Sequence, residues 1–217
     1  MSHSELGACL HVESVALRRR HDKQAAGAPR AEITGPYGAL IKKLTKKRFG
    51  EVPDGIGVMW HNRRVLKTSM ANGQKTKRWN ACDESLKHFA HMSVASLVGC
   101  SFCLDLGYFH AQHQGLDVDK AREVPRWRDS DLFSALERDV LEYAEAMSQT
   151  QPTVTDELSA RLLKKLGPAA LVELTAFIAL ANQVARTNVA LGISGQGFAA
   201  ACGLEPLAQP SAVPTRT

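Results

Sequence analysis

The sequence predicts an all-α protein, and three observations support this prediction. Apolar residues recur at helical spacing in several segments, no long segment alternates with the period of a strand, and short polar or glycine-containing stretches separate the segments. Helices joined by short loops usually pack antiparallel to their neighbours. We therefore expect one helical-bundle domain in residues 35–202, after a flexible basic arm in residues 1–34 and before an extended tail in residues 203–217.

Short helices are expected at the start of the domain. The first covers residues 37–49, and residues 50–57, GEVPDGIG, are expected to form a loop. Residues 58–74 support one or two further helices divided at Asn62, because asparagine favours the position before a helix. The apolar face of the first helix is expected to consist of Leu40, Ile41, Leu44 and Phe49.

Helical periodicity is clearest from Asp83 onward. Asp83 can cap a helix that ends near Gly99, and a second helix follows from Cys100 and ends at Gly115. A short helix and a loop are expected in residues 116–130. The helix that Asp83 caps is expected to carry an apolar stripe of Leu86, Phe89, Ala90, Val94 and Leu97.

The second half of the domain is expected to contain three more helices. The first starts at a Ser130 or Asp131 cap, and the next runs from Thr155 to Gly167. The last starts with Pro168 and is apolar over most of its circumference, so we expect it to be buried on more than one side, partly against a neighbouring subunit. The helix that starts at Ser130 or Asp131 is expected to carry an apolar stripe of Leu132, Leu136, Val140, Leu141 and Ala144.

Composition limits the classes of protein to consider. The 217 residues include five cysteines, an odd number without an apolar export signal, which argues against a secreted disulfide framework. No run approaches about 18 consecutive apolar residues, so we expect a cytoplasmic protein with reduced thiols and no membrane contact. The net charge is +10 in residues 1–80 and −5 in the rest, but no nucleic-acid motif accompanies the basic residues, so nucleic acid is not the expected partner.

Cys100 and Cys103 form a CxxC pair that has three interpretations: a redox couple, part of a metal site, or two small core residues. On a helix they share a face, which Gly107 and His110 continue. A thiol in the first turn feels the positive end of the helix dipole, which lowers its pKa and favours redox chemistry. The opposite face, expected to lie in the core, carries Phe102, Leu106 and Phe109.

The preceding helix presents Glu84, His88 and His91 on one face, at i, i+4 and i+7. If the two helices form a hairpin, an imidazole of this face can take a thiol proton or stabilise the thiolate. The two histidines and the two cysteines could also bind zinc on paper. That would place the cysteines on a regular helix instead of a knuckle turn, so we expect no metal and no other cofactor.

The sequence resembles the carboxymuconolactone decarboxylase family, in its branch similar to alkylhydroperoxidase D. The resemblance lies in GCSFCLDLG, in RWRDSDLFSALERDVLEYAEAM and in the segment TDELSARLLKKLGPAALVELTAFIALANQVARTNVALGISGQGF. It covers residues 53–198, most of the chain. It implies a bundle with an active-site helical hairpin, and assembly as a trimer or hexamer.

The peroxidase branch of the family implies a peroxiredoxin-type antioxidant enzyme. Carried over to this chain, Cys103 attacks the hydroperoxide and becomes a sulfenic acid, Cys100 resolves it as a disulfide, and an external dithiol donor, a protein or a small thiol, recycles the pair. This order differs from the helix-dipole argument, which favours Cys100 as the stronger thiolate.

The proton relay of that branch is not present as such. Its glutamate and histidine positions are occupied here by His88 and Gly107. Asp105 points away from Cys103 on an ideal helix and does not replace them. The candidates for the relay are therefore His88, His91, His110 and Glu84.

Two alternatives stay open. The chain can be a non-catalytic oligomeric family member that keeps the cysteines for packing. It can also be a lactone decarboxylase of aromatic catabolism, with Arg186 or Arg126 pairing with a substrate carboxylate.

Overall fold

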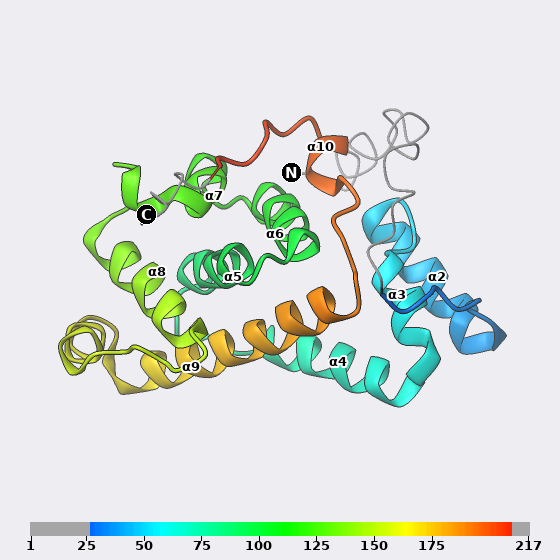
Figure 1. The fold of residues 1–217 in the computed structure, drawn as a ribbon, viewed down its shortest axis with the longest axis horizontal. Coiled ribbons are helices and arrows are strands. Elements are labelled where there is room, and N and C mark those ends of the chain that lie inside the picture. Colours follow the sequence, from blue (N-terminus) through cyan, green and yellow to red (C-terminus); the bar gives the residue numbers. More distant parts are fainter. Residues whose placement is uncertain (1–26, 210–217) are drawn as a thin grey trace, which may run out of the picture.

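The computed structural model describes residues 27–209, and all regular elements in that range are helical (Figure 1), which confirms the predicted fold class. The α-helices are α2 (Gly35–Phe49), α3 (Asp54–Met59), α4 (Arg63–Thr76), α5 (Glu84–Val98), α6 (Ser101–Gln114), α7 (Val118–Glu123), α8 (Ala135–Ser148), α9 (Asp156–Ala190) and α10 (Phe198–Ala201). Two short 3₁₀ helices, η2 (Trp60–Asn62) and η3 (Val124–Asp129), complete the set. Most of the predicted arm and the end of the predicted tail lie outside the described residues.

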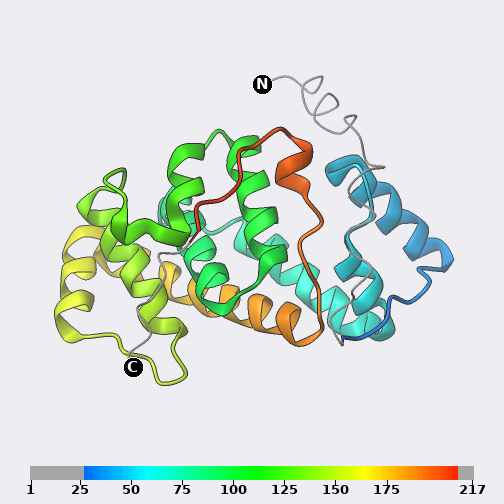
Figure 2. The same cartoon turned by 45° about the horizontal axis from the view of Figure 1, so that its top comes forward.

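Helix α5 is the centre of the bundle, because it packs against α6, α8 and α9. The three N-terminal helices α2, α3 and α4 lie together at one end of the molecule, and α8 lies at the other (Figures 1 and 2). The largest apolar cluster joins α5, α8 and α9 and includes both Cys100 and Cys103. The cysteine pair is therefore part of the main core, between the central helix and the longest one.

Several predicted helix ends are confirmed. Asn62, Asp83 and Thr155 each accept a backbone N–H with their side chain at the start of α4, α5 and α9. Gly99 ends α5 and Gly115 ends α6, both in the left-handed conformation that glycine adopts most easily. The hairpin of α5 and α6 is thus fixed by signals that are local in sequence.

Three expectations about the fold are wrong. The predicted loop at residues 50–57 contains the start of α3, where the backbone N–H of Asp54 donates to Gln196, a partner that is distant in sequence. Helix α8 starts at Ser134, where Ser134 and Glu137 form a reciprocal capping box, and not at Ser130 or Asp131. Leu40 and Leu44 are exposed, because α2 buries only the face around Ile41.

Helix α9 is interrupted at Gly167, where φ is 77° and ψ is 168°, and it continues from Pro168. Its second part is long and apolar enough to cross a membrane by length and composition alone, a property that the core helices of soluble proteins share. Here it packs against α5 and α8. It also carries Glu173 and Arg186, which are engaged in polar contacts inside the bundle.

Candidate active site

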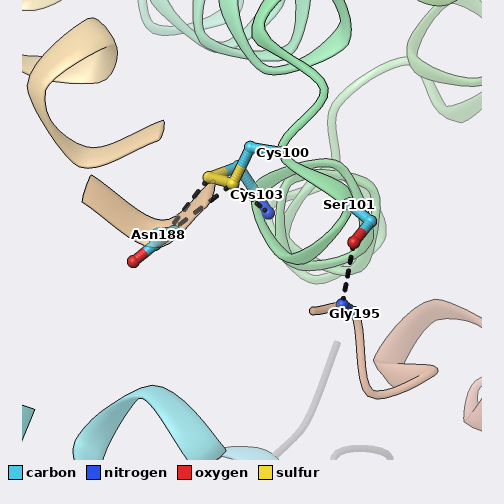
Figure 3. The surroundings of a disulfide bond; sticks show 5 residues. All are labelled: Cys100, Ser101, Cys103, Asn188 and Gly195. Atoms are coloured by element: carbon cyan, nitrogen blue, oxygen red, sulfur yellow. Dashed lines mark hydrogen bonds between the residues drawn. A yellow bond between two sulfur atoms is a disulfide. The ribbon is translucent and has the colours of Figure 1, made fainter. Parts of the chain in front are cut away.

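Cys100 and Cys103 meet at the start of α6. Cys100 is the residue before the helix, and its Sγ accepts the backbone N–H of Cys103 at 3.2 Å. The two sulfurs are joined by a disulfide with an S–S distance of 2.08 Å, so the structure shows the oxidised state of a pair that was expected to be reduced at rest (Figure 3). Cys100 is 0 % exposed and Cys103 is 2 % exposed, so a reactant reaches them only through an internal space.

Asn188 of α9 lies beside the sulfur pair (Figure 3). Its Nδ2 donates to Cys103 Sγ at 3.4 Å and to Cys100 Sγ at 3.9 Å. The amide is buried, and an N–H group aimed at sulfur favours the thiolate over the thiol. Asn188 was not among the predicted site residues, and it lies 85 residues from Cys103 in the sequence.

The connection from α9 to α10 is attached to the first turns of α6. The Ser101 hydroxyl accepts the backbone N–H of Gly195 at 3.1 Å (Figure 3). The Asp105 carboxylate accepts backbone N–H groups of residues 196–199 at 2.7–3.0 Å. Asp105 therefore holds the start of α10 in place against α6.

A cavity of about 350 Å³ lies between α4, α5, α6 and α9. His88 and His91 of α5 and His110 of α6 all line it, so the structure brings the three histidines predicted from the sequence to one space. Asn188 lines the same cavity and contacts both sulfurs. This one amide thus connects the cavity with the redox pair.

The imidazoles of the cavity are held neutral. Burial, followed by the neighbouring His91, lowers the pKa of His88 to about 4. Burial also lowers the pKa of His110, to about 3, with Arg48 as the next cause. The pKa of His91 is lowered by burial and partly restored by a hydrogen bond to the backbone of Cys103. Neutral imidazoles can accept a proton from a thiol or donate one to a leaving oxygen.

His110 also has a cationic partner, since Arg48 Nη2 lies 3.1 Å from its Nε2. The guanidinium can only donate, so His110 Nε2 accepts and its proton sits on Nδ1. This contact joins α2 to α6 across 62 residues of sequence.

Glu84, another predicted relay residue, lies at the rim of the cavity and is 65 % exposed. Its carboxylate lies 3.2 Å from Nζ of Lys87, which is only 2 % exposed and also pairs with Glu173 at 3.0 Å. Burial opposes the charge on Lys87, but the hydrogen bonds to Glu173 and Glu84 raise its pKa above the ordinary value. Glu84 is therefore engaged with a buried cation. Lys87 is a second residue that the sequence analysis missed.

Gly107 occupies the position of the family histidine, and the packing explains the glycine. A Cβ at this position would lie 3.0 Å from Cγ of Met92, a residue of α5 that is 0 % exposed. Met92 would have to move to admit any side chain. The close approach of α5 and α6 at Gly107 thus leaves little room for a side chain at this position.

The two arginines considered for a carboxylate substrate have structural partners. Arg186 Nη2 donates to the carbonyl oxygen of Ser148 at 2.5 Å, and Arg126 forms an ion pair with Glu123 at 2.5 Å. Neither lines the cavity beside the sulfurs. Within residues 27–209, the structure contains no group of three or more histidine, cysteine, aspartate or glutamate side chains arranged to hold a metal ion.

Comparisons with known proteins agree with this architecture. The model of the carboxymuconolactone decarboxylase family matches residues 64–146. The uncharacterized protein YnjA of Escherichia coli (strain K12) is 37 % identical over 158 residues, which are 71 % of this chain and 86 % of that protein. The chain belongs to the carboxymuconolactone decarboxylase family.

Two solved structures place the fold within that family. The debrominase Bmp8 superposes with a TM-score of 0.69 at 20 % identity and covers 82 % of this chain and 97 % of its own. The alkylhydroperoxidase AhpD core of an uncharacterized peroxidase-related protein from Ralstonia eutropha JMP134 gives a TM-score of 0.60 at 14 % identity, with 81 % and 97 % coverage. The fold is that of the alkylhydroperoxidase D-like branch.

Proposed function

We propose that the protein is a thiol-dependent hydroperoxide reductase that uses Cys100 and Cys103 as its redox couple. The observation that carries the proposal is the position of the pair: two cysteines able to form a disulfide, next to a cavity lined by three neutral imidazoles. Family membership supports it. An external dithiol recycles the enzyme, which we place in the cytoplasm.

The reaction proceeds in two thiol steps and one recycling step. The Cys103 thiolate attacks the terminal peroxide oxygen, the O–O bond breaks, and the alkoxide leaves with a proton as an alcohol. The Cys100 thiol then attacks the sulfenic acid, so the disulfide forms and water leaves. The dithiol donor returns two electrons and two protons by thiol–disulfide exchange.

The imidazoles provide the proton transfers. His91 is the first candidate for the base, because its side chain contacts the backbone of Cys103. His88 occupies the family glutamate position, one helical turn before His91, and lines the cavity as well. His110 is bound to Arg48, so its Nε2 is already engaged and its role is to position the guanidinium.

The test is the reduction of cumene hydroperoxide by the reduced protein, with dithiothreitol as donor. We expect Cys103→Ser to abolish turnover. In Cys100→Ser, reduced and then freed of dithiothreitol, one equivalent of cumene hydroperoxide should leave a sulfenic acid on Cys103, detected by mass spectrometry. Cys82→Ser is the matched control: Cys82 is buried and free, and burial raises the pKa of its thiol to about 11, so its replacement leaves the rate unchanged.

The outcome against the proposal is equally specific. If peroxide treatment produces neither a sulfenic acid on Cys100 or Cys103 nor a disulfide between them, the proposal is wrong. The protein is then the non-catalytic family member. The two arginines considered for a lactone carboxylate, Arg126 and Arg186, have structural partners outside the cavity.

A further inference from the structure

The cavity beside the sulfurs has an excess of positive charge at one end. Arg48 and Lys77 both line it. Among residues 27–209, no carboxylate lies within 4.0 Å of either cation, whereas the buried Lys87 is matched by Glu84 and Glu173. Burial and then the charge of Arg48 lower the pKa of Lys77, and the Glu84 carboxylate, which also lines the cavity, opposes them with a smaller effect.

One residue that lines the cavity has an unsatisfied polar atom. Nε2 of His88 is buried and has no hydrogen-bond partner among the described residues, and the whole residue is 8 % exposed. A buried polar atom without a partner costs about 1–3 kcal/mol, so native proteins rarely keep one without a reason. Since His88 lines the cavity, a ligand there can supply the missing partner.

Part of the wall that α9 contributes is apolar. Phe177, Leu180 and Val184 line the cavity from α9 at spacings of three and four residues, which places them on one face. Along α6, His110 lies seven residues after Cys103, a rise of about 10 Å. The cation pair beside His110 and the sulfur pair therefore lie at opposite ends of an apolar path.

We propose that this cavity binds a small organic acid, with its carboxylate between Arg48 and Lys77 and its apolar chain along α9. This inference rests on the proposed function and gives it a substrate class: an organic hydroperoxide that carries an acidic group remote from the peroxide. An Arg–carboxylate contact in a partly enclosed site is charge-assisted and stronger than a neutral hydrogen bond. The acidic group thus holds the chain so that its far end points to Asn188, the cavity residue that contacts both sulfurs.

The test is a binding measurement that needs no turnover. Octanoate and octanamide have the same chain and differ in charge, and isothermal titration to the oxidised full-length protein at low ionic strength compares them directly. We expect octanoate to bind at least tenfold more tightly. The preference should disappear in the double variant Arg48→Met/Lys77→Met.

The matched control is Lys47→Met/Lys75→Met. These two lysines are exposed on the same two helices, and neither lines the cavity, so the variant loses the same total charge. We expect it to keep the preference for octanoate. Equal binding of the two probes to the wild type, no binding of octanoate, or a preference that survives Arg48→Met/Lys77→Met overturns the inference.

The two proposals fail separately. If cumene hydroperoxide is reduced but octanoate shows no advantage over octanamide, the peroxidase function stands and the acid site is wrong. If octanoate binds with the expected preference and no hydroperoxide is reduced, the site stands and the redox function is wrong.

Discussion

Asn188 is the residue through which α9 acts on the chemistry of α6. Its amide reaches both sulfurs, and the shorter contact, 3.4 Å, is to Cys103. Cys100 receives its hydrogen bond from the first turn of α6 instead. Asn188 is the N–H donor that the structure gives to Cys103, whereas Cys100 has the backbone donor as well as the longer contact to Asn188. Under the proposed function, Asn188 is therefore a positioning residue for the Cys103 thiolate.

We expect Asn188→Leu to raise the pKa of the Cys103 thiol by about one unit. A hydrogen bond to a charged group contributes about 1.5 kcal/mol, and one pKa unit corresponds to about 1.4 kcal/mol. The thiolate absorbance of the reduced protein, titrated in a Cys100→Ser background, measures this pKa. Asn182→Leu is the control, because that amide lies on the same helix and bonds to Ser148. An unchanged titration in Asn188→Leu would refute the role.

Protonation of His88 should destabilise the fold in acid. Its pKa is about 4 in the folded state against 6.5 in the absence of burial, so between these values the unfolded chain binds a proton that the folded chain does not. The free energy of unfolding therefore falls as the pH is lowered from 6.5 to about 4, by about 1.4 kcal/mol per pH unit for one group. Urea denaturation across this range should show a smaller slope for His88→Gln. His61→Gln, at an exposed site, should keep the wild-type slope, and equal slopes in both variants would contradict the assignment.

The sequence could predict the site residues that share one hairpin. Cys100, Cys103, His88, His91 and His110 lie within 23 positions, and helix periodicity places them on facing surfaces. Asn188 and Arg48 could not be found in this way. Each reaches the hairpin by folding back over 60 residues or more, and a lone asparagine or arginine on a helix has no distinctive local pattern.

At the scale of the elements, α9 depends on one glycine. Gly167 has φ 77° and ψ 168°, a combination that only glycine adopts at low cost, and it lets the chain change direction before Pro168. The two parts of the helix therefore pack as separate rods, and the second one carries Asn188 to the sulfurs.

Gly167→Ala should destabilise the protein by about 1–3 kcal/mol, the cost of forcing a side chain into this backbone conformation. Gly73→Ala is the matched control, because a Cβ meets nothing within 4 Å at either position and Gly73 lies inside α4 without a positive φ. There alanine should stabilise by about 0.5–1 kcal/mol. Urea denaturation of both variants measures the difference, and equal midpoints would show that backbone strain at Gly167 is not the cause.

Helix boundaries could be predicted where the signal is local in sequence. The predictions were wrong where a boundary depends on distant partners or on a choice between similar caps. The Asp83 and Thr155 caps and the Gly99 and Gly115 ends follow from residue type. The capping box of α8 was readable as a serine followed three residues later by glutamate, but two similar candidates precede it. Helix α3 is held by distant partners, so local propensity was insufficient.

For the whole molecule, the question is what covers the outer face of α9. In the part of the chain that the structure describes, Val172 is 69 % exposed, and Val189 is 46 % exposed near the end of the same helix. A helix that is apolar on the side facing solvent is usually buried in an assembly. We propose that the homo-oligomer, a trimer or hexamer by resemblance to the family, uses the surface around Val172.

We expect light scattering to give a multiple of the chain mass for the wild type, and Val172→Lys to shift the distribution toward the monomer. A charge at this position would have to be buried without a partner in the interface, which is costly, whereas in the monomer it meets water. Leu44→Lys is the control, since Leu44 is 53 % exposed on α2, at the other end of the molecule. A wild type that is monomeric at all concentrations would contradict assembly, and a response to Leu44→Lys alone would move the interface to α2. Because α9 contributes both this surface and part of the cavity wall, the same measurement with octanoate bound would show whether assembly and ligand binding are coupled.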